Sequence, residues 1–181
     1  MIGAVDIGGT KVALGLVDRQ GRVAAQAVLP TATLLRYTDA VAALTGTLRT
    51  LMARSGCGIE GAGIGLTGRV DGATGRIGRN DLLPDWQGRD LAGDLQRELQ
   101  VPVAIENDAD AAALGEAAWG AGRGMPRFIY VTVSTGIGGG IVLDGRLSRG
   151  VDGSHPEIGH HVIDPSGPPC YCGARGCWES M

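Results

Sequence analysis

The chain has 181 residues, a formal net charge of −3 and a low aromatic content of 4%. This length suffices for one domain with a sizeable core. The mildly acidic balance and scarce aromatics give no basis for binding nucleic acid or an anionic membrane. With no leader peptide and no apolar run long enough to span a bilayer, the sequence predicts a cytoplasmic α/β protein.

The first third of the chain predicts an antiparallel meander followed by a helix. Three apolar strands separated by Gly-containing turns are expected, over 2–5, 12–17 and 23–28. Apolar residues at helical spacing then predict an amphipathic helix: Val41, Leu44, Leu48 and Leu51. A short buried strand at 64–66 follows. The stretch 68–90 is expected to be loop-rich, with a small hairpin near Gly75.

The rest of the chain predicts further alternation of helices and strands. A second amphipathic helix, a strand and an Ala-rich helix are expected, near 91–99, 101–105 and 108–120. Strands at 128–133 and 141–143 follow, and the segment from Gly150 is irregular and polar, as expected where a metal replaces a core. This order of elements resembles one lobe of the ribonuclease H-like fold shared by actin, Hsp70 chaperones and sugar kinases.

A glycine-rich turn near the amino terminus is suited to phosphate binding. Gly8 and Gly9 lack a Cβ, so that backbone N–H groups can approach phosphate oxygens, while Thr10 adds a hydroxyl and Lys11 a cation. The turn follows Asp6 and leads into a strand, which excludes a Walker A loop. The alternative is an ordinary Gly-rich hairpin.

A second glycine-rich turn is predicted over 134–140, and it includes Thr135 and Gly136. It leads into a strand and not into a helix, so a dinucleotide-binding fingerprint is excluded. A second phosphate clamp is the preferred interpretation, and a plain β-hairpin is the alternative.

Asn107 and Asp108 lie between a predicted strand and the Ala-rich helix. They could cap that helix, and Asp108 could also act as a general base on a substrate hydroxyl, with Asn107 orienting it. A helix N-terminus favours an ionised Asp, which phosphoryl transfer tolerates. Glu106 and Asp110 are nearby alternatives that are less well placed.

The carboxyl-terminal stretch predicts a structural zinc site. Cys170, Cys172 and Cys177 lie within eight positions, and a histidine, either His160 or His161, completes a set of four ligands. Glu157 and Glu179 bracket this set. His155 is interpreted first as a loop residue and second as a substrate contact, and Cys57 as inert.

Taken together, these motifs resemble the ROK family of sugar kinases and repressors. The resemblance rests on five segments in order along the chain: 6–11, 107–109, 134–140, 157–160 and 170–179. It implies ATP-dependent phosphorylation of a hexose or N-acetylhexosamine, a cytoplasmic location and a homodimer at full length. It also implies a first lobe over 1–120 and the start of a second over 121–181, with family members continuing far beyond the zinc motif.

The resemblance assigns roles to individual residues. Asp6, Gly8, Gly9, Thr10 and Lys11 would hold the nucleotide phosphates and Mg²⁺, and Thr135 and Gly136 would close over them. Asp108 would be the base. The sugar would contact Gly68, Asn80, Asn107, Asp108, Glu157, His160 and Glu179. Structural Zn²⁺ on His160, Cys170, Cys172 and Cys177 would fix the two glutamates in place.

Alternatives remain for substrate and function. Glucose is the preferred sugar, but Pro156 before Glu157 resembles fructokinase-like members, so fructose, mannose and N-acetylhexosamines stay open. A ROK-type transcriptional regulator is disfavoured because Met1 leads directly into the first strand, which leaves no room for a preceding DNA-binding domain. A non-catalytic sugar-binding remnant is the third hypothesis.

Overall fold

The computed structural model describes residues 1–71, 74–134, 136–151 and 153–181. The chain divides into two compact units, Met1–Asp108 and Ala109–Met181, and both combine helices with a β-sheet. The mixed α/β class is therefore confirmed, whereas the division into lobes over 1–120 and 121–181 stays a prediction. None of the described helices is both long and apolar enough to cross a lipid bilayer.

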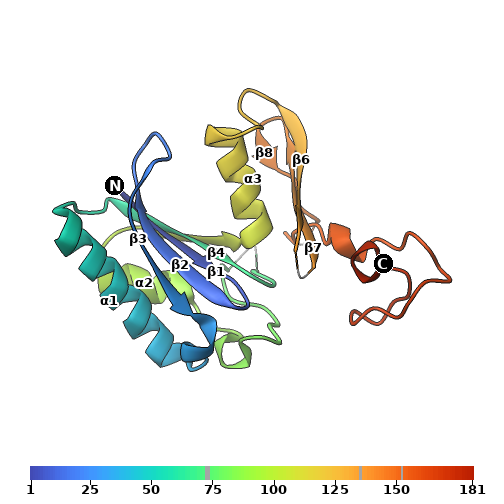
Figure 1. Cartoon of the computed structure of the whole chain (residues 1–181), viewed down its shortest axis with the longest axis horizontal. Coiled ribbons are helices and arrows are strands. Elements are labelled where there is room, and N and C mark those ends of the chain that lie inside the picture. The colour runs from blue at the N-terminus through green and yellow to red at the C-terminus, as the bar shows by residue number, and fades with distance from the viewer. Residues whose placement is uncertain (72–73, 135, 152) are drawn as a thin grey trace. The chain divides into compact units, whose positions relative to one another are not determined.

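The first unit is built on a five-stranded sheet in the order β3-β2-β1-β4-β5 (Figure 1). Its strands are β1 (Ile2–Ile7), β2 (Lys11–Val17), β3 (Val23–Pro30), β4 (Gly61–Leu66) and β5 (Val103–Asn107). β1, β4 and β5 run parallel, and the register places Asp6 beside Gly65 and Gly65 beside Glu106. The carboxyl ends of the three parallel strands therefore meet at one edge of the sheet, where ligands bind in open α/β sheets.

The first strand continues further than the sequence predicts. β1 ends at Ile7 and β2 begins at Lys11, because Asp6 pairs with Ala13 and Ile7 with Val12. Asp6 and Lys11 are thus strand-end residues, and the turn itself comprises Gly8, Gly9 and Thr10.

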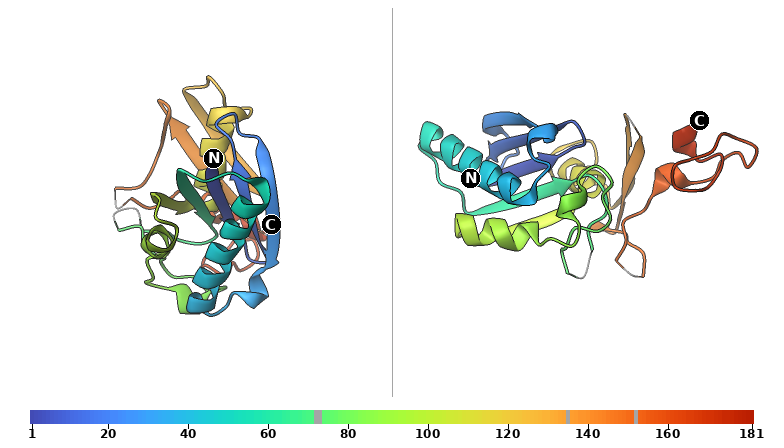
Figure 2. Two further views of the ribbon diagram at one scale, coloured as in Figure 1. Left: turned by 90° about the vertical axis from the view of Figure 1, so that its left-hand side faces the viewer. Right: turned by 90° about the horizontal axis from the view of Figure 1, so that it is seen from below.

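Two helices, α1 (Tyr37–Ser55) and α2 (Leu91–Leu99), pack beside each other on the sheet (Figures 1 and 2). Both predicted amphipathic helices are confirmed, since Leu44, Leu48 and Leu95 are fully buried. α1 starts at Tyr37, four residues before the predicted apolar face, because the backbone N–H of Tyr37 donates to Asp85 Oδ2 at 2.8 Å.

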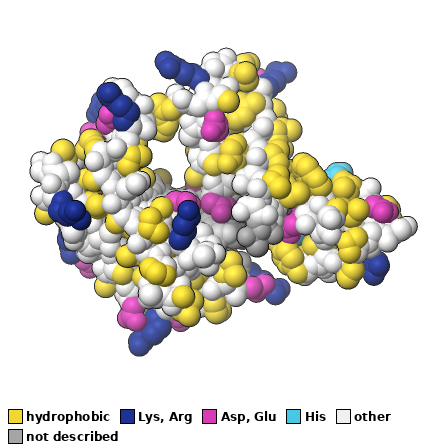
Figure 3. Space-filling model, in the orientation of Figure 1, with side chains coloured by type: hydrophobic (Ala, Val, Ile, Leu, Met, Phe, Trp, Pro, Cys, Tyr) yellow, Lys and Arg dark blue, Asp and Glu magenta, His cyan; other side chains and the backbone are white. Residues whose placement is uncertain are grey.

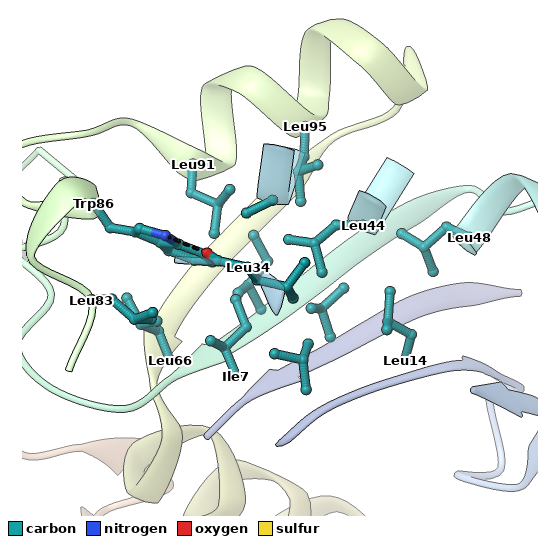
Figure 4. Close-up of a cluster of buried hydrophobic side chains, with 14 of the residues drawn as sticks. Ile7, Leu14, Leu34, Leu44, Leu48, Leu66, Leu83, Trp86, Leu91 and Leu95 are labelled. Carbon is teal, nitrogen blue, oxygen red and sulfur yellow. Dashed lines mark hydrogen bonds between the residues drawn. The ribbon is translucent and has the colours of Figure 1, made fainter. Parts of the chain in front are cut away.

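The core of this unit lies between the sheet and these helices (Figure 4). Trp86, at the end of the short helix η2 (Pro84–Trp86), is fully buried, and its Nε1–H donates to the carbonyl of Leu34 at 3.0 Å. This hydrogen bond fixes the loop before α2, because it satisfies the polar atom of the indole inside the core. The loop in turn carries Asn80, a predicted site residue.

The second unit combines α3 (Asp108–Trp119), whose first residue belongs to the first unit, with a three-stranded antiparallel sheet. Its strands are β6 (Arg127–Val133), β7 (Ile137–Leu143) and β8 (Arg146–Leu147). β7 and β8 are joined by Asp144 and Gly145, both at positive φ, 51° and 75°. Two residues at positive φ are what a two-residue hairpin requires.

The predicted glycine-rich turn over 134–140 is wrong in its extent, because β7 already begins at Ile137 and Gly138–Gly140 are paired with β6. A Cβ on Gly139 would collide with Ile158, and a Cβ on Gly140 would collide with Ala113. These glycines therefore let neighbouring segments approach the sheet closely.

The described part of the carboxyl-terminal segment contains two single-turn helices, η3 (Ile158–His160) and η4 (Trp178–Ser180), joined by loops (red in Figure 2). η3 packs on β7, where Gly159 has no room for a Cβ beside the carbonyl of Ile137. The irregular segment expected from Gly150 onward is confirmed.

Candidate functional site

The first group of candidate residues is the turn between β1 and β2. It is closed by the N–H of Gly8, which donates to the carbonyl of Lys11 at 3.0 Å, and it is braced by Thr31, whose hydroxyl donates to the carbonyl of Gly8 at 2.8 Å. Within the described residues, the N–H groups of Gly9 and Thr10 donate to no protein oxygen. Two adjacent donors in a turn are suited to a phosphate oxygen.

Asp6 and Asp108 place negative charge at the same edge of this sheet. Asp6 keeps contact with solvent, yet partial burial raises the pKa of its carboxyl, the charge of Asp108 raises it further, and Lys11 opposes the shift. Carboxylates that repel each other favour binding of a hard cation, and oxygen ligands are those that Mg²⁺ prefers. The residues present therefore fit a Mg²⁺ ion that accompanies nucleotide phosphates.

Replacing Asp6 by Asn is expected to raise the thermal unfolding temperature near pH 7 and to leave it unchanged near pH 3. Because the pKa of Asp6 is raised by folding, the protonated carboxyl favours the folded state. That contribution is complete below the unfolded pKa of about 3.9 and is lost as the pH rises through the folded pKa. The Asn side chain is uncharged at every pH, so the variant does not lose this stability as the pH rises. Thermal unfolding followed by circular dichroism measures the difference.

Asp18 provides a matched control of opposite sign. The N–H of Arg22 and the N–H of Gln20 donate to its carboxylate, at 2.9 Å each, and these bonds lower its pKa. Asp18→Asn should therefore reduce stability near pH 7. A lower unfolding temperature for Asp6→Asn at that pH would contradict a raised pKa of Asp6 in the folded state.

Two asparagines and one glycine of the predicted sugar site meet beside the carboxyl ends of β4 and β5. The amide of Asn107 donates to the carbonyl of Gly68 at 3.1 Å, and the amide of Asn80 donates to the carbonyl of Thr67 at 2.8 Å. Gly68 has φ of 91°, and a Cβ there would lie 3.0 Å from Asn80 Nδ2.

The hydrogen bonds of Asn80 leave its side chain little freedom. Its Oδ1 accepts the N–H groups of Leu82 and Leu83 at 3.1 and 3.0 Å. An asparagine amide has two N–H donors, so one donor of Asn80 remains for a ligand beyond these bonds. Asn80 therefore shapes the loop and could contribute a single hydrogen bond to a substrate.

The four predicted zinc ligands lie together in the second unit. One ligand atom from each of His160, Cys170, Cys172 and Cys177 lies within 4.8 Å of the others. Cys170 Sγ is 3.5 Å from His160 Nδ1, and Cys172 Sγ is 3.6 Å from Cys177 Sγ. Sulfur atoms at ~2.3 Å from a tetrahedral zinc ion lie about 3.8 Å apart, so the residues fit zinc.

The surroundings of Cys172 and Cys177 shift the pKa values of their thiols in opposite directions. The N–H of Ala174 lowers the pKa of the Cys172 thiol, whereas burial raises the pKa of the Cys177 thiol to about 12. Zinc binds the thiolate, so the lowered pKa of Cys172 favours coordination, whereas binding at Cys177 would have to release the thiol proton to solvent. Of the two candidate histidines, His160 is the one that faces the cysteines.

Two side chains next to the cluster connect it with the predicted sugar contacts. His160 Nε2 lies 3.1 Å from the hydroxyl of Tyr171, and His160 Nδ1 lies 3.9 Å from Glu179 Oε1. The other carboxylate oxygen of Glu179 accepts the N–H of Ile137 at 2.8 Å. A Cβ on Gly136 would collide with this carboxylate, so Gly136 makes room for Glu179.

The remaining predicted contacts are placed as follows. Glu157 precedes η3 and its side chain is 60% exposed, while the backbone N–H of His160 donates to its carbonyl at 3.0 Å. Thr135 lies outside the described residues. Tyr171 has no role predicted from the sequence, and Asp110 is considered there only as an alternative base. Its contacts with Arg149 and His155 join segments that are distant in sequence, so no local pattern indicates them.

The chain matches the ROK family over residues 2–181. It is 37% identical to a glucokinase of Thermotoga maritima, over 98% of this chain and 55% of that protein. It is also 42% identical to a xylose repressor of Bacillus subtilis, over 72% of this chain and 33% of that protein.

Among solved structures, the chain is similar to a ROK family glucokinase from Streptomyces griseus in complex with glucose and AMPPNP. The TM-score is 0.79 at 36% identity, over 98% of this chain and 55% of that one. The chain thus spans about half the length of this structure and of the Thermotoga glucokinase. Since the family match, the fold and the order of motifs agree along its length, the chain belongs to the ROK family.

Proposed function

We propose that the protein is a cytoplasmic ATP-dependent sugar kinase that phosphorylates a hexose hydroxyl, with glucose as the preferred substrate. One observation carries the proposal: the turn Gly8–Thr10 and the carboxylates of Asp6 and Asp108 share the sheet edge at which the three parallel strands β1, β4 and β5 end. Phosphoryl transfer needs positioned phosphates, a cation site and an acceptor for one proton, and these residues supply all three.

The proposed roles follow from the chemistry of each group. Lys11 and the N–H groups of Gly9 and Thr10 hold the terminal phosphates. Asp6 would hold a Mg²⁺ ion, which would supply positive charge to the phosphate oxygens. Asp108 accepts the proton of the sugar hydroxyl while the oxygen of that hydroxyl attacks the γ-phosphorus and ADP departs as the leaving group. Thr135 and Gly136 are proposed to close over the phosphates.

The sugar is proposed to contact Gly68, Asn80 and Asn107 in the first unit, and Glu157, His160 and Glu179 in the second. Zinc on His160 and the three cysteines performs no chemistry in this scheme. Its part is to fix the conformation of the segment that carries the two glutamates. A homodimer is proposed for the protein at the length of its relatives.

A sugar-responsive regulator is the second candidate, favoured by the similarity to the Bacillus subtilis xylose repressor. The chain carries a net charge of only −3, and on the face drawn in Figure 3 the Lys and Arg side chains are scattered. Neither feature supplies a basic surface for DNA. The intact turn beside Asp6 and Asp108 favours the kinase.

The test measures ADP release from ATP and Mg²⁺ with glucose, fructose, mannose and two N-acetylhexosamines. The 181-residue chain is assayed beside a hybrid completed with the part of the Thermotoga maritima glucokinase that it does not span. Fastest turnover on glucose is expected from the hybrid. Equal rates on all sugars would contradict the glucose assignment. Sugar binding without turnover in either form would favour the remnant, and a salt-dependent DNA shift would favour the regulator.

A further inference from the structure

A buried group of charged side chains lies in the second unit, beside the residues assigned above. Asp110, in the first turn of α3, is fully buried, and its carboxylate lies 3.3 Å from Arg149 Nη2. On its other oxygen, Asp110 faces His155 Nδ1 at 3.8 Å. Burying charge is costly unless partners compensate, so a fully buried Asp in an Ala-rich helix needs a reason beyond packing.

His155 connects this group with Glu157. Its imidazole is 9% exposed, and while Nδ1 faces Asp110, Nε2 faces Glu157 Oε1 at 3.7 Å. The backbone favours this arrangement, because the residue before a proline is restricted to extended conformations and alternate side chains of an extended chain share a side. Pro156 thus places His155 and Glu157 on one side of a stiff segment.

The contact between His155 and Glu157 is longer than a hydrogen bond, yet close enough for attraction between an imidazole N–H and a carboxylate. The side chain of Glu157 is 60% exposed, so it has space to change rotamer and approach Nε2 of His155. An exposed glutamate loses rotamer freedom when it binds a ligand, and a partner that restricts it beforehand reduces that cost.

We propose that Asp110 and His155 are positioning residues: Asp110, balanced by Arg149, orients the imidazole of His155, which holds the carboxylate of Glu157 for a sugar hydroxyl. The inference rests on the proposed function, because that function assigns Glu157 to the sugar. Neither Asp110 nor His155 touches the reacting atoms. Their effect is confined to sugar affinity, because nucleotide binding is assigned to other residues.

The test compares His155→Ala with His161→Ala, which removes an exposed neighbouring imidazole. Sugar affinity is measured by calorimetry on the zinc-loaded chain. Steady-state kinetics on the hybrid gives the KM for sugar, the KM for ATP and kcat. His155→Ala should weaken sugar binding about tenfold, with a smaller effect on the KM for ATP. His155→Gln keeps a donor of similar reach and should restore part of the affinity. His161→Ala should match the wild type.

A double-mutant cycle separates positioning from a general structural effect. If His155 acts through Glu157, the variant His155→Ala/Glu157→Gln should bind sugar no more weakly than Glu157→Gln alone. Additive losses would overturn the proposal. If the wild-type chain and the hybrid bind no sugar of the panel, the proposed function fails. The contact between His155 and Glu157 is then tested by the same double-mutant cycle in thermal unfolding. Additive effects of the two substitutions on the unfolding temperature would overturn it.

Discussion

Removing zinc with a chelator is expected to unfold residues 158–181 while the first unit stays folded. The reason is that this segment has almost no hydrophobic core. Its buried residues are three glycines and two of the proposed ligands: Gly159, Gly167, Gly176, Cys170 and Cys177. No larger apolar side chain is buried in it. Structural zinc contributes apparent binding energies of about 10–16 kcal/mol in small zinc domains, which greatly exceeds anything this segment gains from packing.

Hydrogen exchange with mass spectrometry measures this effect directly, because it reports protection segment by segment. Chelation, or Cys177→Ser, should abolish protection over 158–181 and preserve it in β1 and β4. Cys57→Ser is the matched control, since Cys57 belongs to the first unit and is not one of the four candidate ligands. One equivalent of zinc per chain is expected. A chain that holds no zinc and keeps full protection in this segment would refute the zinc site.

Loss of zinc should also disturb the positions of the proposed sugar contacts Glu157 and Glu179. Glu179 follows Cys177 by two residues, and its carboxylate holds the N–H of Ile137 at the start of β7. The N–H of His160 donates to the carbonyl of Glu157, so the ligand and the glutamate share one turn of chain. A metal bound by His160 and Cys177 would therefore restrict both glutamates.

The sequence predicts those parts of the fold in which the pattern is local. Leu91, Leu95 and Leu99 define α2 because a helical face repeats within nine residues. The four predicted zinc ligands follow from spacing and ligand type, and the structure brings these four side chains together. The turn at Gly8 and the junction at Asp108 are likewise visible as short motifs.

What the sequence does not predict depends on contacts between distant segments. The start of α1 is set by Asp85, which lies 48 positions from Tyr37, and no capping residue announces it. Gly139 and Gly140 resemble a turn but are strand residues, because Ile158 and Ala113 need the space of their missing side chains. Asp110, Arg149 and His155 come together only in the folded unit.

Replacing Asp108 by Asn is expected to reduce kcat of the hybrid by about 10²–10⁴-fold, the range typical of a lost general base. Asn keeps the shape of the side chain at the junction of β5 and α3 but cannot accept the proton of the sugar hydroxyl. Because the change leaves the first turn of α3 intact, sugar affinity should fall much less than kcat. Steady-state kinetics on the hybrid, with calorimetry for sugar affinity, separates the two effects.

A second measurement examines the same variant without any turnover. The charge of Asp108 raises the pKa of Asp6, so Asp108→Asn should lower the pKa of the Asp6 carboxyl toward its ordinary value. Carboxyl chemical shifts followed by NMR through a pH titration of the 181-residue chain report this directly. Glu106→Gln is the matched comparison, because Glu106 lies two residues earlier and was the alternative base. Undiminished turnover in Asp108→Asn, with turnover lost in Glu106→Gln, would move the role to Glu106. An unchanged pKa of Asp6 would show instead that the two acids do not interact.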